Sequence, residues 1–182
     1  MNDDTGPRLR PIAELNQLAP REFADALRPL FEAAGPLAAA LHAQRPFASY
    51  LDLLVRAEFL AGRLTTEAQI EVVSAHPRIG ESADAVRQRS VLSYREQGYD
   101  ADAALPPDEL QSVYETLADL NRAYEQRFGF RFVVFVNGRP KSEIVNVLQA
   151  RLRNSPEEEL LAGLQAMFLI ARDRLAHLSA GS

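Results

Sequence analysis

Apolar residues recur at spacings of three or four residues along almost all of this 182-residue chain, which is the pattern of amphipathic helices. One run departs from the pattern: Phe132 to Val136 consists only of β-branched and aromatic residues, as strands do. A lone strand has no partner for its backbone, so we expect a buried, irregular extended segment there. The sequence therefore predicts an all-α fold, a single-domain helical bundle of about seven to nine helices with one irregular segment near 131–137.

Capping residues and prolines indicate where these helices begin and end. Ser49, and Thr65 or Thr66, can cap two of them, and Ser155 can cap the last. Pro29 is expected to break the first helix, because a proline has no N–H to donate. Residues 1–19 are expected to form a loosely ordered lead-in to a single helical domain over 20–178. Further helices are expected at about 20–31, 37–44, 90–97, 106–128 and 140–153.

The composition excludes several classes of function. A formal net charge of −5 argues against an electrostatic nucleic-acid binder, and no apolar run approaches the ~20 residues that span a bilayer. The sequence has no cysteine, which removes disulfides, thiolate nucleophiles and zinc–thiolate sites. Its acidic, polar start is unlike a signal peptide. We therefore expect a cytoplasmic protein with neither a membrane nor a nucleic acid as partner.

Lys141 is the only lysine among the 20 basic residues, so Schiff-base chemistry could use no other side-chain amine. It directly follows Pro140 at an expected helix start, where we expect it to be exposed and hard to desolvate. Glycine-rich phosphate loops, H-E-x-x-H metal motifs and G-x-S-x-G nucleophile elbows are absent. This leaves acid–base work by histidine, glutamate and arginine as the chemistry open to the chain.

His76 precedes Pro77, and Gly80 follows, so the histidine lies where a helix must end in a tight turn. One interpretation is a helix-end histidine whose charged form is favoured by the helix dipole. The other is a catalytic imidazole, since its ordinary pKa of about 6.5 allows proton transfer near neutrality. On position alone, the first is the commoner case.

Ser93, Glu96 and Gln97 share one face of a short helix and could present a hydroxyl, a carboxylate and an amide to a small polar molecule. The same S-x-x-E spacing is typical of a capping box, although Gly98 would end such a helix almost as it began. A solvated polar face is a further alternative.

Two more features have both a structural and a functional interpretation. Arg151 borders an apolar stripe, where arginine usually pairs with a carboxylate, yet its guanidinium also suits a carboxylate or urea-like ligand. The residues Phe132, Val133, Val134, Phe135 and Val136 are core by composition, but an irregular backbone there would leave N–H and C=O groups for a ligand.

Together these segments resemble one family, the 2-oxo-4-hydroxy-4-carboxy-5-ureidoimidazoline (OHCU) decarboxylases of urate breakdown. The matching stretches occur in the family's order and cover roughly 20–178. One departure is the stretch Gly98 to Ala103, where many members have a small Ala-Gly-Leu loop. The stretches are Arg45-Pro46-Phe47, His76-Pro77-x-x-Gly80, Ser93-x-x-Glu96-Gln97, Leu120-Asn121-x-x-Tyr124-x-x-Arg127-Phe128-Gly129-Phe130-x-Phe132-Val133, Arg151-Leu152-x-Asn154 and Glu159-Leu160.

The resemblance implies an all-helical fold, usually a homodimer, with no metal or organic cofactor. It implies that His76 is the catalytic acid/base, with Glu96 beside it. It also implies the groups that would bind the substrate, a small ureidoimidazoline. These are Pro77, Ser93, Gln97, the backbone of Phe132 to Val136, and Arg151, which could instead contact the dimer edge.

Such an enzyme needs no external electron sink, because the substrate carries a C=N group beside the carbon that loses CO₂. The protein would orient the carboxylate and protonate one face, giving S-allantoin. Two other functions remain open at this point: a decarboxylase or lyase of a related ureido- or carboxy-imidazoline, allowed by the altered loop, and a helical interaction module in which His76 is only a cap.

Overall fold

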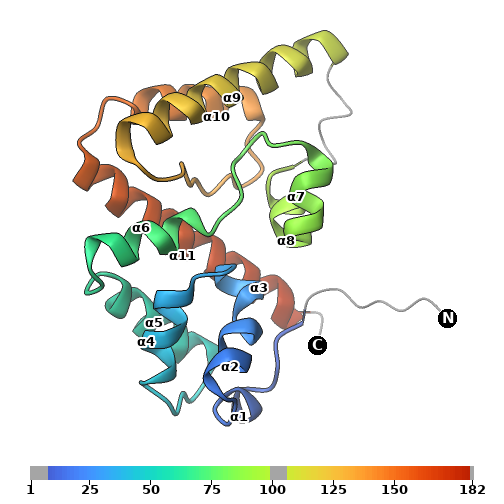
Figure 1. The fold of residues 1–182 in the computed structure, drawn as a ribbon. Helices are drawn as coiled ribbons and strands as arrows, with labels where there is room; N and C mark the ends of the chain where they lie inside the picture. The colour runs from blue at the N-terminus through green and yellow to red at the C-terminus, as the bar shows by residue number, and fades with distance from the viewer. Residues whose placement is uncertain (1–7, 99–105, 181–182) are drawn as a thin grey trace, which may run out of the picture.

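The computed structural model describes residues 8–98 and 106–180, and this part of the chain folds into helices without a strand. The predicted all-α fold is confirmed, with eleven helices in the described residues rather than seven to nine (Figure 1). They are α1 (Ile12–Leu15), α2 (Pro20–Ala26), α3 (Arg28–Phe31), α4 (Gly35–His42), α5 (Tyr50–Ala61), α6 (Thr66–Ser74), α7 (Ala83–Arg89), α8 (Val91–Glu96), α9 (Pro107–Phe128), α10 (Lys141–Arg151) and α11 (Pro156–Ala180).

The higher helix number has local causes. The expected helix over 20–31 is two helices that meet at Leu27, because Pro29 has no N–H to continue the ladder. Helix α7 lies outside the helix ranges expected from the sequence, and Ser82 caps it by accepting a hydrogen bond from the N–H of Ala85 at 3.3 Å. The predicted caps Ser49 and Thr65 are confirmed, since their side chains accept from the backbone N–H three residues on.

The expectation of a loose lead-in needs correction for residues 8–19. Helix α1 lies in this segment, and its Leu15 is fully buried in the main core. Asn16 then pairs with Phe47: its side-chain amide donates to the Phe47 carbonyl and its oxygen accepts from the Phe47 N–H, both at 2.9 Å. Apolar burial and this reciprocal pair therefore anchor the segment. Residues 1–7 lie outside the described part.

Helix α11 is the central element of the bundle. In Figure 1 it crosses the middle of the molecule, with α2–α5 below it and α9 and α10 above it. It packs against α3, α5 and α6, and α4 fills the space between α2, α5 and α6. Gly163 allows close approach to α6, since a Cβ there would stand 3.0 Å from a methyl group of Val73.

The segment predicted to be irregular is so: residues 131–136 form neither helix nor strand and connect α9 to α10. Helices α7 and α8 form a hairpin at the edge of the bundle (Figure 1). Its buried residues Val86 and Tyr94 form a small cluster with Tyr114 of α9, separate from the main core. The cavity described below lies where the hairpin, the irregular segment and α11 meet.

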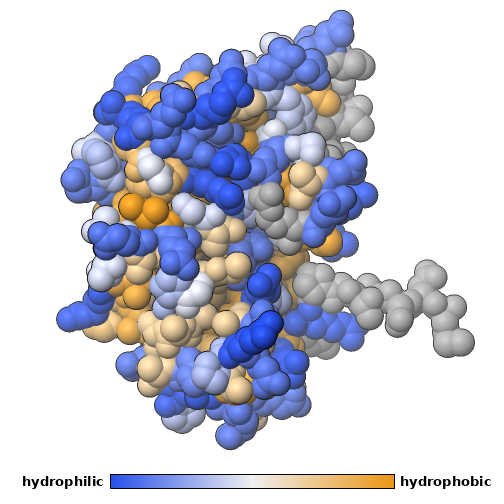
Figure 2. All heavy atoms as spheres, viewed as in Figure 1, coloured by the Kyte–Doolittle hydropathy of each residue, from blue (hydrophilic) through white to orange (hydrophobic). Residues whose placement is uncertain are grey.

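The surface over α9 is mainly hydrophilic, whereas apolar residues gather across the middle and lower left of the same face, beside α4, α5 and α6 (Figure 2). On α5 the side chains of Leu51, Val55 and Phe59 are 60%, 56% and 63% exposed. None of the helices in the described residues combines the length and apolar character that a membrane-spanning helix requires.

Candidate active site

His76 follows α6, which ends at Ser74, in a turn held by the long helix α9. The side-chain amide of Asn121 donates to the Ile79 carbonyl at 2.9 Å. Gly80 has φ +79°, a left-handed conformation that favours glycine, and Leu117 packs directly on it. The side chain of Arg131 donates to the His76 carbonyl at 3.1 Å. The turn after α6 is therefore fixed on several sides, and the imidazole position with it.

The imidazole of His76 is buried, with 3% of the residue exposed. Neither of its ring nitrogens has a hydrogen-bond partner among the described residues. Burial, with a smaller contribution from the nearby Arg174, lowers the pKa of His76 to about 4, while Glu32 opposes the shift. At neutral pH the ring is therefore uncharged, with one nitrogen able to donate and the other able to accept.

Glu96 is held by Arg174, a buried arginine of α11. The Arg174 Nε donates to one carboxylate oxygen of Glu96 at 2.6 Å and Nη2 donates to the other at 2.7 Å. The Nη1 atom lies 2.8 Å from a carboxylate oxygen of Glu32. Burial by itself lowers the pKa of Arg174, but the hydrogen bonds and attraction of the two carboxylates outweigh it and raise the pKa. One guanidinium thus fixes two carboxylates beside the cavity.

Ser93 belongs to the same network. Its Oγ accepts from Arg174 Nη2 and donates to a Glu32 carboxylate oxygen, each at 2.9 Å, and the Oγ of Ser90 donates to the same oxygen. Glu32 has φ +56°, which is uncommon for a residue other than glycine. Its strained backbone directs the carboxylate to a network that holds α3, α8 and α11 together.

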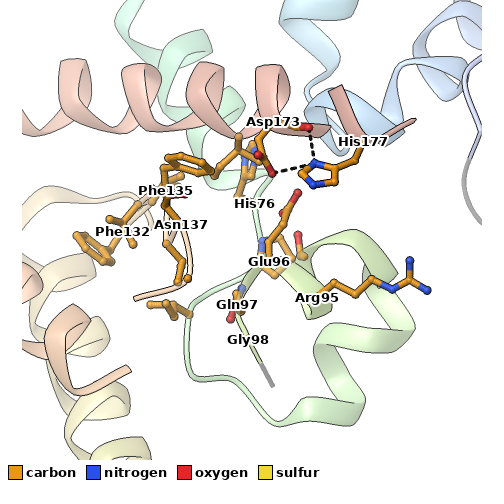
Figure 3. Close-up of a pocket in the computed structure, with 18 residues that line it drawn as sticks. His76, Arg95, Glu96, Gln97, Gly98, Phe132, Phe135, Asn137, Asp173 and His177 are labelled. Atoms are coloured by element: carbon orange, nitrogen blue, oxygen red, sulfur yellow. Dashed lines mark hydrogen bonds and ion pairs between the residues drawn. The ribbon is translucent and has the colours of Figure 1, made fainter. Parts of the chain in front are cut away.

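His76, Ser93 and Glu96 line a cavity of about 290 Å³, near the lower end of the ~300–1,000 Å³ of small-molecule pockets. In Figure 3, Glu96 and Gln97 approach it from the hairpin, and Asp173 and His177 from α11. His177 Nδ1 lies 2.8 Å from the Asp173 carbonyl, which can only accept, so Nδ1 carries a proton. The lining residues are His76, Pro77, Ile79, Ser93, Arg95, Glu96, Gln97, Gly98, Phe132, Val133, Val134, Phe135, Val136, Asn137, Gly138, Ile170, Asp173 and His177.

The wall formed by Phe132 to Val136 has its carbonyls occupied by arginines. Arg151 donates to the Val133 carbonyl at 2.8 Å, and Arg139 donates to the carbonyls of Phe135 at 2.6 Å and Val136 at 3.0 Å. The backbone N–H groups of 132–136 donate to no other described residue. The segment therefore brings unpaired donors to the cavity wall.

Ten of the eleven predicted site residues line this one cavity, and Arg151 does not. Its Nε donates to both carboxylate oxygens of Glu159, at 3.1 and 2.9 Å, and its guanidinium lies 4.7 Å from the centre of the Phe132 ring. Glu159 is fully buried and also accepts from Tyr124 and Asn154. Arg151 thus supports the wall from behind, because a buried carboxylate competes for its guanidinium.

Sequence reasoning missed Arg174, Glu32, Asp173 and His177. Arg174 could have been found from its position, since a charge inside the apolar face of a long helix needs a buried partner.

The expectation that Lys141 is exposed was wrong: the residue is buried, with 3% exposed, and donates to the Gln97 carbonyl at 2.9 Å. Residues 99–105, which include most of the altered stretch after Gln97, lie outside the described part of the chain. No group of three or more His, Asp or Glu in the described parts is arranged to hold a metal.

Comparison with known proteins agrees with the resemblance. The family model described as OHCU decarboxylase matches residues 16–176. The chain is 34% identical to the uric acid degradation bifunctional protein PucL of Bacillus subtilis (strain 168), over 91% of this chain but only 32% of that protein. It is 30% identical to the 2-oxo-4-hydroxy-4-carboxy-5-ureidoimidazoline decarboxylase of Haloferax volcanii, over 91% of this chain and 94% of that one.

A solved structure has a similar fold: a crystal structure of OHCU decarboxylase in the presence of (S)-allantoin superposes with a TM-score of 0.65 at 22% identity, over 85% of this chain and 96% of that chain. The chain therefore spans about a third of the Bacillus protein and nearly all of the Haloferax protein. Because the family model matches nearly the whole length, this chain belongs to the OHCU decarboxylase family.

Proposed function

We propose that this protein catalyses the cofactor-independent decarboxylation of 2-oxo-4-hydroxy-4-carboxy-5-ureidoimidazoline to (S)-allantoin, a step of urate breakdown. The observation that carries the proposal is the buried imidazole of His76, which lines the cavity and has no hydrogen-bond partner on either nitrogen among the described residues. A buried polar group left unpaired costs free energy, which a bound ligand with a donor and an acceptor would recover. Membership of the OHCU decarboxylase family supports the assignment of the reaction.

The cavity wall suits a ureide. Ureido and ring amide groups present carbonyl oxygens, and the unpaired N–H groups of 132–136 are donors for them. The side-chain amide of Gln97 and the hydroxyl of Ser93 lie on the opposite wall. These groups would orient the ring so that its carboxylate stands out of the ring plane, where the breaking bond aligns with the C=N group.

The bond changes need no group beyond the substrate and a proton donor. When CO₂ leaves, the electron pair of the broken C–C bond forms a C=C bond with the neighbouring carbon. The C=N electrons move onto nitrogen, which takes a proton from solvent. The resulting enol loses its hydroxyl proton, and the former imine carbon gains one, which gives allantoin.

The uncharged state of His76 suits the last step. An uncharged imidazole can take the hydroxyl proton of the enol and return it to the neighbouring carbon. The carboxylate of Glu32 would favour the imidazolium that exists between the two transfers, while Arg174 and burial keep that state short-lived. Delivery from one fixed side would produce a single enantiomer.

The experiment generates the substrate from urate with the two preceding enzymes and follows its ultraviolet band and the circular dichroism of allantoin. We expect the wild type to accelerate decay and to form one enantiomer. We expect His76→Asn to keep its thermal transition and lose about 10²–10⁴-fold in rate. His42→Asn changes a histidine outside the cavity and should retain turnover. Wild-type decay at the spontaneous rate would refute the proposal.

We also propose that the protein is a homodimer. The exposed residues Leu51, Val55 and Phe59 follow one another at i, i+4 and i+8 on α5, and a contiguous apolar patch of this kind is typical of an interface. Two copies of α5 related by a twofold axis near Val55 would pack Leu51 of one against Phe59 of the other. Sedimentation of the wild type and of Phe59→Asp tests this, and a monomeric wild type would contradict it.

Two further proposals concern the cellular location and the number of domains. The absence of cysteine supports a cytoplasmic location, because it fits a reducing compartment, and cell fractionation tests it. We further propose that 20–178 fold as a single domain, supported by the continuous main core that runs from Phe23 to Ala171. One cooperative transition in urea, seen alike by fluorescence and circular dichroism, is expected.

A further inference from the structure

Lys141 is a buried cation that the proposed mechanism does not use. It is the first residue of α10 and the only lysine of the chain. Its Nζ donates to the carbonyl oxygen of Gln97 at 2.9 Å and lies 5.5 Å from the centre of the Tyr114 ring. Burying an ammonium group costs free energy unless partners compensate. The bond to the Gln97 carbonyl, at the end of α8, and the nearby Tyr114 ring offset part of this cost.

The hairpin of α7 and α8 carries three of the predicted site residues, Ser93, Glu96 and Gln97. Its buried apolar residues are Val86 and Tyr94, which pack with Tyr114 in a small cluster separate from the main core. Other described attachments are polar, and they include the Glu96–Arg174 ion pair and the bond from Gln97 Nε2 to the Arg78 carbonyl at 3.4 Å. Polar attachments can be exchanged for water, so a hairpin held in this way can open at moderate cost.

Two cations hold the C-terminal end of α8. Arg174 binds the side chain of Glu96 from α11, and Lys141 binds the backbone of Gln97 from α10. Two residues separate helix α10 from the segment 132–138, which forms the other wall. The Lys141–Gln97 bond therefore joins the two walls between which a substrate would lie.

We propose that Lys141 is a positioning residue that latches the α7–α8 hairpin against the irregular segment, so that the closed cavity binds its anionic ureide substrate. The inference rests on the proposed function. Without the latch, the hairpin spends more time open, and substrate binding must supply the free energy of closing it. The apparent affinity then falls in proportion to the closed fraction, while the closed complex reacts as before.

The first experiment compares Lys141→Met, Lys141→Arg and the wild type in the coupled assay. Loss of one charged hydrogen bond predicts a KM about 10–100-fold higher for Lys141→Met, with kcat within a few-fold of the wild type. Lys141→Arg keeps a donor and should recover most of the affinity. Arg153→Met, which removes a positive charge from an exposed position just beyond α10, is the matched control and should leave KM unchanged.

A purely structural role would give a different result. Partial unfolding lowers the amount of active enzyme, so kcat would fall at constant KM. That pattern, or an unchanged KM in Lys141→Met, would overturn the inference. If the wild type itself shows no turnover, the proposed function fails instead, and the second experiment then tests the latch alone.

The second experiment uses the wild type, so it does not depend on a variant that folds. Reductive methylation with ¹³C-formaldehyde labels only Lys141 and the amino terminus, because the chain has no other lysine. Lys141 can react only when it becomes exposed. Allantoin at a concentration that saturates its shift of Tm should slow the labelling of Lys141 several-fold and leave the amino terminus unaffected. Equal Lys141 labelling with and without allantoin would overturn the proposed latch.

Discussion

Replacing His76 by glutamine should remove most of the dependence of stability on pH that this residue causes. The pKa of His76 is about 4 in the folded protein and 6.5 in an unfolded chain. Between these two values the unfolded chain binds more protons than the folded one, so folding becomes less favourable as the pH falls. Above pH 6.5 both states hold an uncharged ring and the stability contribution is complete; it is lost as the pH falls through 4.

The magnitude follows from the shift. Each pKa unit corresponds to 1.36 kcal/mol, and the shift is about 2.5 units, so the wild type should lose about 3 kcal/mol of stability between pH 7 and pH 4 through His76. The variant His76→Gln has no such titration. Its stability relative to the wild type should therefore rise by about this amount over the same pH range.

Urea unfolding at pH 7, 5.5, 4.5 and 4, followed by far-ultraviolet circular dichroism, measures the difference. Other titrating groups occur in both proteins and cancel in the comparison. Histidine ring signals in NMR, with His76 assigned through the variant, give the titration midpoint directly. A midpoint near 6.5, or a wild-type-to-variant difference that stays constant from pH 7 to pH 4, would show that the buried, unpaired environment of the ring has been misunderstood.

Three further perturbations follow from the packing and the buried charges. Gly80→Ala should cost about 1–3 kcal/mol in urea unfolding, because φ is +79° and the new Cβ would stand 2.9 Å from Leu117, and kcat should fall as the turn after α6 shifts. Arg174→Met should cost about 3–5 kcal/mol, since it leaves two carboxylates without their cation, and a change below 1 kcal/mol would argue against the network. Glu159→Gln should lower Tm measurably by weakening the bonds from Arg151 and Tyr124, while the cavity-facing side chains and therefore kcat stay within a few-fold.

The fold was predictable where a pattern repeats or a cap has a local cause. The stripe on 107–128 and the caps Ser49 and Thr65 depend on neighbouring residues only, and all three are as expected. Helix α1 was not predicted, because a helix of four residues contains too few residues to show a period. Its order depends on contacts distant in sequence, such as the Asn16–Phe47 pair.

The site was predictable in part for the same reason. Within the sequence, His76 and Glu96 are separated by a turn and two short helices, and the resemblance rather than the spacing suggested that they belong together. Arg174, which pairs with Glu96, and Glu32, which pairs with the same guanidinium, come from near opposite ends of the chain. Burial of Lys141 and the position of Arg151 behind the wall are likewise products of tertiary packing, which single-sequence periodicity does not contain.

Four cationic side chains hold carbonyl oxygens of the cavity wall from outside, and their combined effect is an electric field. Arg131 holds the carbonyl of His76, Lys141 that of Gln97, Arg151 that of Val133 and Arg139 that of Phe135. They place four positive charges around a cavity that Glu96 and Asp173 also line, in a chain whose net charge is −5. A carboxylate ligand would be attracted by these four charges, and added salt would screen the attraction beyond about 10 Å at 0.1 M. Three of the four are arginines, and a guanidinium keeps its charge through the acidic range in which His76 titrates, so these contacts persist while the imidazole changes charge.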